Sequence, residues 1–64
     1  MQIKDLIKVA GSDLYVVDNA TGELIELTNN LPAIVQFYEA TIKTIYPACN
    51  VRKNGRVCLL VYLL

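Results

Sequence analysis

The chain has 64 residues, with six basic and six acidic side chains, and 55% of its residues are hydrophobic. The neutral balance argues against a strongly basic nucleic-acid binder and against an acidic mimic of DNA. A domain of this size buries only about 60% of the surface that its unfolded chain exposes, so its core usually needs support from a disulfide, a metal or another subunit.

Residues that could support catalysis or bind a metal are scarce. The sequence has no His, a single Ser and two Cys, and the spacing of Cys49 and Cys58 fits no zinc site. Catalysis needs positioned acids, bases or nucleophiles, and the sequence shows no such set. We therefore expect a non-enzymatic protein without metal or other cofactor.

Targeting features are also missing from the sequence. The first residues, MQIKDLIKVAG, carry charges inside their only apolar stretch, unlike a signal peptide. No run approaches the roughly 20 apolar residues that span a bilayer. We expect one cytoplasmic domain over residues 1–64, with both cysteines reduced.

The charged residues are sorted along the chain. Every charged residue between Val9 and Ile42 is acidic, and every one from Lys43 onward is basic, namely Lys43, Arg52, Lys53 and Arg56. The two halves pair within one fold, or they meet between subunits or on a partner and steer association. The four basic residues are candidate contacts for an anion or a partner, and a solvated turn would look the same for the last three.

The first half of the chain predicts a short helix and a β-hairpin. Apolar residues at helical spacing indicate a helix over residues 3–9, with Gly11 at the position of a C-cap glycine. Residues 13–27 predict a hairpin around the turn sequence DNATG, with Asp18 opposite Glu23. One face of this hairpin is expected to join the core and carries Leu14, Val16, Ile25 and Leu27. The other face is also largely apolar and carries Tyr15, Val17, Leu24 and Glu26.

A second helix is predicted after Asn30. Asn30 can cap the helix, and Pro32 is tolerated in its first turn. An apolar stripe, which we expect to face the core, is formed by Leu31, Ile34, Val35 and Tyr38, with Phe37 beside it. The β-branched residues that follow predict that the helix ends near Ala40.

The C-terminal residues predict a second hairpin. Residues 41–46 alternate as a strand does, and Pro47 marks an edge position or a bulge. Asn54-Gly55 indicates a two-residue turn that would place Lys53 opposite Arg56 and Val51 opposite Cys58. The predicted core face carries Val57, Leu59, Val61 and Leu63. The opposite face carries Cys49, Val51, Cys58, Leu60 and Tyr62.

Eight consecutive apolar residues, 57–64, need cover on both faces of their strand, which is hard for a chain of 64 residues to supply alone. We therefore expect part of this strand to be buried in a partner. The predicted interface comprises Tyr15, Val17, Leu24, Val51, Cys58, Leu60 and Tyr62. Cys49 and Cys58 share this face, where they act as small buried hydrophobic residues, form a disulfide between subunits or have a redox role.

Together these elements predict an α+β domain of order αββαββ, with one antiparallel sheet and both helices on one face. The pattern KDLIKV over residues 4–9, the hairpin around DNATGE and the pattern IKTIYP over residues 42–47 resemble small uncharacterised proteins encoded by bacteriophages and prophages. That resemblance implies a bacterial host cell and a size class that includes anti-CRISPR and other anti-defence inhibitors, which act by stoichiometric binding.

Three functions remain open from the sequence. The first is a protein-binding inhibitor that works as a small homo-oligomer and docks on a host protein. The second is an oligomer that sequesters a nucleotide signal through Arg52, Lys53 or Arg56. The third is a structural module that only assembles with itself.

Overall fold

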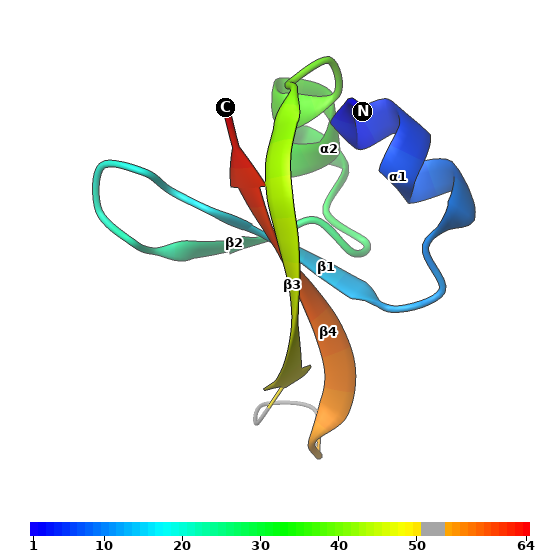
Figure 1. Cartoon of the computed structure of the whole chain (residues 1–64). Coiled ribbons are helices and arrows are strands. Elements are labelled where there is room, and N and C mark those ends of the chain that lie inside the picture. Colours follow the sequence, from blue (N-terminus) through cyan, green and yellow to red (C-terminus); the bar gives the residue numbers. More distant parts are fainter. Residues whose placement is uncertain (51–53) are drawn as a thin grey trace.

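The computed structural model describes residues 1–50 and 54–64 and contains two helices and four strands in these residues. Their bounds are α1 Ile3–Val9, β1 Asp13–Val17, β2 Leu24–Glu26, α2 Leu31–Phe37, β3 Ile42–Asn50 and β4 Arg56–Leu63. Figure 1 shows the two helices beside the upper part of the sheet and the two hairpins projecting in different directions. The predicted α+β class and the element order are confirmed.

The sheet is mixed rather than antiparallel. Its strand order is β2-β1-β4-β3, and the two central strands, β1 and β4, run parallel. The prediction joined two hairpins without allowing for the passage through α2, which brings the last strand back beside the first. This arrangement gives the continuous apolar run of β4 a central place, and it leaves β3, which contains Pro47, at an edge where proline is tolerated.

The core lies between one face of the sheet and both helices. Ile3 and Leu6 from α1 and Ala33 from α2 pack with side chains of β1, β4 and the segment after β2, namely Leu14, Val16, Leu27 and Val61. Because both helices contribute to the same cluster, the prediction that they cover one face is confirmed.

The first helix has the predicted bounds but a different end. Gln2 caps its start, and the backbone N–H of Gln2 donates to Oδ2 of Asp5 at 3.1 Å. The chain leaves the helix at Ala10 in an extended conformation, with φ −74° and ψ 129°. Gly11 is therefore not the left-handed C-cap that the sequence predicted, because the extended exit at Ala10 needs no glycine.

The second helix is shorter and rotated relative to the prediction. Asn30 caps it, with Oδ1 accepting from the N–H of Ala33 at 3.4 Å, but it ends at Phe37. Ala33 is buried, and Ile34 and Phe37 pack against the core. Other members of the predicted stripe point outward, with exposed fractions of 69% for Leu31, 68% for Val35 and 41% for Tyr38.

This rotation follows from the way in which α2 is held at both ends. The side chain of Asn30 donates to the carbonyl of Glu26 at 2.8 Å, and the N–H of Lys4 donates to the carbonyl of Tyr38 at 2.9 Å. The apolar residues of α2 are spread too widely around the helix for all of them to face the sheet. The two hydrogen bonds at its ends hold α2 in one orientation, and this orientation determines which apolar residues face the sheet.

The first hairpin has the predicted register. Val16 lies opposite Ile25, Val17 lies opposite Leu24, and the N–H of Asp18 donates to the carbonyl of Glu23 at 2.9 Å. Oδ1 of Asp18 accepts from the N–H of Ala20 at 2.8 Å, so the carboxylate stabilises its own turn.

The C-terminal hairpin differs from the prediction in length and register. β3 continues past Pro47 to Asn50, and Asn50 lies opposite Arg56. Cys49 therefore pairs with Val57 rather than with Leu60, the partner that the predicted pairing of Val51 with Cys58 implies. This is a shift of three residues, and an odd shift moves side chains to the other face. Asn54 and Gly55 do have the positive φ values, 56° and 74°, that such a turn favours. Cys58 lies opposite Ala48 and Arg56 lies opposite Asn50, so the predicted pairs with Val51 and Lys53 are wrong. Val51 and Lys53 themselves lie outside the described residues.

Candidate functional site

The sheet has a second face, on the side away from the two helices. From the strand registers, its described members are Asp13, Tyr15, Val17, Leu24, Glu26, Thr44, Tyr46, Ala48, Arg56, Cys58, Leu60 and Tyr62. This set contains every described residue of the interface predicted from the sequence. Val51, the remaining member of that interface, lies outside the described residues.

The second face is buried unevenly. Tyr15 and Cys58 are only 7% and 3% exposed within one subunit, so they have little area to offer a partner. The hydroxyl of Tyr15 also donates to Oε2 of Glu26 at 3.5 Å. Val17, Leu60 and Tyr62 are partly buried, whereas Leu24 is 55% exposed. The apolar area that a partner could contact therefore lies on the strands beside β1 rather than at the middle of β1.

Tyr46 is the prominent residue that the sequence interpretation missed. It is 55% exposed and lies opposite Leu60, on the same face as Tyr62. The Tyr46 and Tyr62 rings meet edge to face, with centroids 5.4 Å apart and planes at 90°. This geometry is a favourable one for an aromatic pair. Continued along the strand, the predicted register would put Tyr46 on the core face, and the three-residue shift is what brings it to Tyr62.

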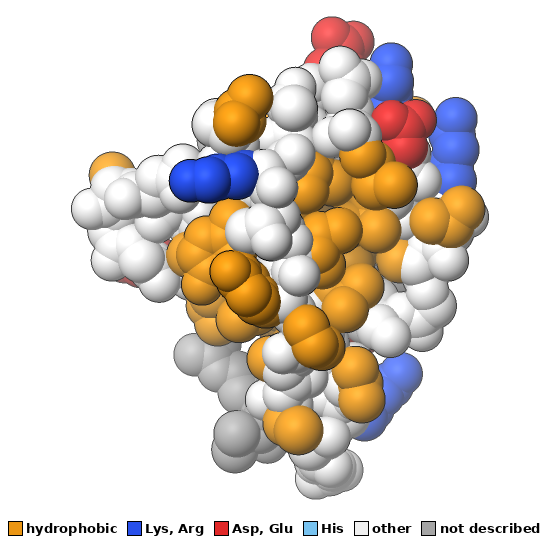
Figure 2. Space-filling model, viewed as in Figure 1, with side chains coloured by type: hydrophobic (Ala, Val, Ile, Leu, Met, Phe, Trp, Pro, Cys, Tyr) orange, Lys and Arg blue, Asp and Glu red, His pale blue; other side chains and the backbone are white. Residues whose placement is uncertain are grey.

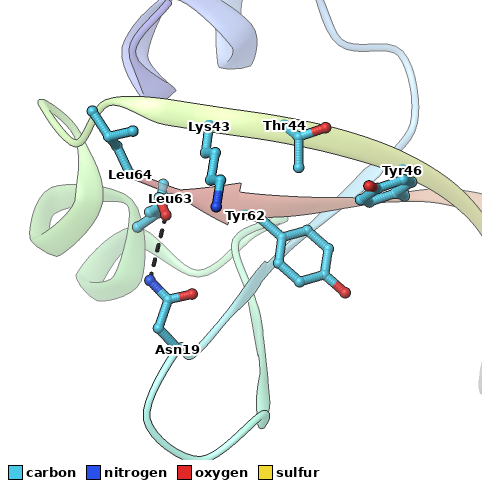
Figure 3. Close-up of a pocket in the computed structure, with 7 residues that line it drawn as sticks. All are labelled: Asn19, Lys43, Thr44, Tyr46, Tyr62, Leu63 and Leu64. Carbon is cyan, nitrogen blue, oxygen red and sulfur yellow. Dashed lines mark hydrogen bonds between the residues drawn. The ribbon is translucent and has the colours of Figure 1, made fainter.

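Lys43 lies beside this tyrosine pair because β3 is irregular at its start. Ile42 lies opposite Leu63 and Thr44 lies opposite Tyr62, so Lys43 is an extra residue with no partner on β4. A β-bulge of this kind redirects a side chain relative to the regular alternation of a strand. Figure 3 shows the Lys43 side chain extending from β3 across β4 toward the side where Tyr62 and Asn19 lie.

These residues line a groove of about 650 Å³, which we call the Lys43 groove. Its lining residues are Asn19, Lys43, Thr44, Tyr46, Tyr62, Leu63 and Leu64. Nδ2 of Asn19 donates to the carbonyl of Leu63 at 3.3 Å and so fixes the loop after β1 against the end of β4 (Figure 3).

The two predicted basic contacts that the structure describes, Lys43 and Arg56, lie apart. Arg56 is exposed and pairs with Asn50 at one end of the β3–β4 hairpin, whereas Lys43 lies at the other end of β3. Arg52 and Lys53 lie outside the described residues. Arg56, which was predicted to contact a nucleotide, does not line the Lys43 groove.

The two cysteines are on opposite faces of the sheet. Cys49 pairs with Val57 and is exposed, whereas Cys58 pairs with Ala48 and is buried, and both are free thiols. The prediction that they share a face is wrong because of the register shift. A disulfide between them within one subunit is not compatible with this arrangement.

The outer side of α2 forms another apolar surface. A shallow groove of about 620 Å³ runs along it and is lined by Leu31, Ile34, Val35, Gln36, Tyr38, Glu39 and Ala40. Tyr38, which the sequence assigned to the core, is part of this surface.

Within residues 1–50 and 54–64, there is no group of three or more side chains that could hold a metal ion. No helix in this part of the chain is long and apolar enough to cross a membrane. Comparison of the chain with protein-family models, curated proteins and solved structures gives no match.

Proposed function

We propose that this chain is a non-enzymatic protein-binding module that works as a small homo-oligomer and uses the second face of its sheet for association. The observation that carries the proposal is the exposure of large apolar side chains on a sheet face that neither α1 nor α2 covers. Leu24 and Tyr46 are each 55% exposed there, and Tyr62 packs against Tyr46.

The distribution of apolar side chains supports this proposal. Figure 2 shows hydrophobic side chains gathered on both sides of β3, the strand that crosses the middle of the view, and the group on the side away from the two helices belongs to the second face. Contiguous apolar surface of this kind is typical of interaction sites on small proteins. Tyrosine is enriched in interfaces because its ring provides apolar area while its hydroxyl stays compatible with water.

The edge strand β3 is poorly suited to pairing with a strand of another molecule. Association through a face of the sheet is therefore favoured. β3 is an edge strand, and it contains Pro47, which has no N–H to donate to an added strand. The bulge at Lys43 interrupts the ladder near the other end of the strand. Both features protect a sheet edge from adding another strand. The partner is therefore expected to lie on the face that carries Tyr46 and Tyr62.

The resemblance to phage and prophage proteins supports a second part of the proposal, in which the oligomer binds a bacterial host protein and inhibits it. Tagged wild-type protein is compared with Tyr46→Glu and Val35→Glu in capture from bacterial lysate. Val35 is 68% exposed on α2, so its variant adds the same charge away from the second face.

The wild-type protein and Val35→Glu are expected to capture the same host protein, and Tyr46→Glu is expected to lose it. Equal capture by all three proteins, or loss with Val35→Glu alone, would contradict a role for the second face. Light scattering on the same three proteins tests self-association separately from host binding.

A further inference from the structure

We propose that the Lys43 groove binds a small aromatic monocarboxylate. This site goes beyond protein association, although it shares Tyr46 and Tyr62 with the proposed interface. It combines a cation placed by a β-bulge with a pair of aromatic rings in one concave surface.

The bulge is the first reason to regard the groove as a binding site. Regular alternation from Thr44, which lies opposite Tyr62, would turn its neighbour Lys43 to the core side of β3. The bulge brings the Lys43 ammonium group to the tyrosine side instead. Bulges are over-represented next to functional sites, where they redirect a side chain in this way.

The walls of the groove suit a planar apolar body. Tyr46 and Tyr62 meet at 90°, so together they present ring face and ring edge to the groove. Leu64, which is 84% exposed, adds apolar surface, and Thr44 adds a hydroxyl group. The volume of about 650 Å³ lies within the range of about 300–1,000 Å³ that is typical of small-molecule sites.

The side-chain charge of the groove favours an anionic ligand. Lys43 is the one charged side chain among its described lining residues. The nearby carboxylate of Asp18 is directed into its own turn, where it accepts from the backbone N–H groups of Ala20 and Thr21. A single ammonium group neutralises a carboxylate fully but a phosphate monoester only in part, so a monocarboxylate is the better match.

The test uses 2-naphthoate as the probe and follows the backbone amide resonances of the full chain by NMR titration. Shifts are expected to concentrate at Lys43, Thr44, Tyr46 and Tyr62. The neutral isostere 2-naphthamide and the non-aromatic cyclohexanecarboxylate are both expected to bind more weakly. Equal binding of the amide would overturn the role of charge, and equal binding of cyclohexanecarboxylate would overturn the aromatic class.

Lys43→Met and Lys8→Met form a matched pair of variants. Both remove one ammonium group, but Lys8 is exposed on α1 and does not line the groove. Lys43→Met is expected to weaken 2-naphthoate binding by about tenfold, the loss of one charge-assisted contact, while Lys8→Met leaves it unchanged. A well-dispersed amide spectrum shows that each variant is folded.

Equal affinity in the two variants, or no shifts with 2-naphthoate in the folded wild-type protein, would overturn the site. Light scattering on the same samples keeps this result separate from self-association. An oligomer that does not bind 2-naphthoate would remove the ligand site and leave the proposed function standing. A monomer that binds 2-naphthoate would support the ligand site and contradict the proposed self-association.

Discussion

Val16 of β1 lies directly opposite Val61 of β4 in the parallel ladder, and the two side chains are 1% and 0% exposed. The next pair along the ladder, Val17 and Tyr62, faces the other side of the sheet and is only partly buried. Alternate residues of each strand thus have different roles, because one set packs in the core and the other set lies on the second face. This alternation leads to the first prediction.

Leu59→Glu is expected to unfold the subunit, whereas Tyr62→Glu is expected to dissociate the oligomer and leave the subunit folded. Leu59 is partly buried and packs against the core, so a charge there loses apolar contacts and part of its hydration in a core that supplies only roughly 3–5 kcal/mol. Tyr62→Glu loses the contact with Tyr46, about 1 kcal/mol. Circular dichroism and light scattering separate the two outcomes, and identical behaviour of the variants would show that the face assignment is wrong.

The orientation of α2 predicts opposite effects for two glutamate substitutions within one helical turn. Ala33→Glu places a charge where the side chain is 6% exposed, so loss of the folded state is expected. Val35→Glu adds the charge at a position that is 68% exposed, and the free energy of unfolding should change by less than about 0.5 kcal/mol. Urea denaturation measures both. A large loss of stability in Val35→Glu would mean that the stripe predicted from the sequence does face the core.

Asn30 is expected to contribute more to stability than an ordinary helix cap. Its Oδ1 accepts from the N–H of Ala33, and its Nδ2 donates to the carbonyl of Glu26 at 2.8 Å. Asn30→Ala should therefore lower the free energy of unfolding by about 2 kcal/mol, the sum of a lost cap and a lost hydrogen bond. Gln36→Ala, at an exposed position of the same helix, is the control and should be nearly neutral in the same denaturation experiment.

Two glycines test the turn geometry. Gly55 has φ 74°, in the left-handed region, so Gly55→Ala is expected to destabilise the subunit by about 1 kcal/mol. Gly11 does not have positive φ, and a methyl group added there would meet nothing within 4 Å. Gly11→Ala should therefore be neutral or stabilise by up to about 1 kcal/mol. Thermal unfolding of both variants measures the difference, and equal effects would contradict the left-handed turn at Gly55.

The features that could be predicted from the sequence are those with a local cause. Helix α1 follows from the spacing of Ile3, Leu6 and Ile7, and the first hairpin follows from its turn residues, with Val17 opposite Leu24 as predicted. The start of α2 follows from Asn30 as a cap. Each of these depends on residues that are close together in the sequence.

The features that could not be predicted depend on long-range packing. The parallel pairing of Leu14 with Leu59 depends on how the chain returns through α2, and no local pattern encodes it. The rotation of α2 depends on tethers to Glu26 and Lys4. The register of the last hairpin was assigned from Asn54-Gly55 alone, and this error concealed the place of Tyr46 in the candidate site.

The most direct test of the central claim is the mass of the chain in solution, measured by light scattering over a range of concentrations. The proposed association through the second face predicts at least twice the subunit mass of 7.1 kDa, and it predicts that Tyr46→Glu returns the mass to that of one subunit. A folded wild-type chain that stays at 7.1 kDa at every concentration would contradict self-association through Tyr46 and Tyr62.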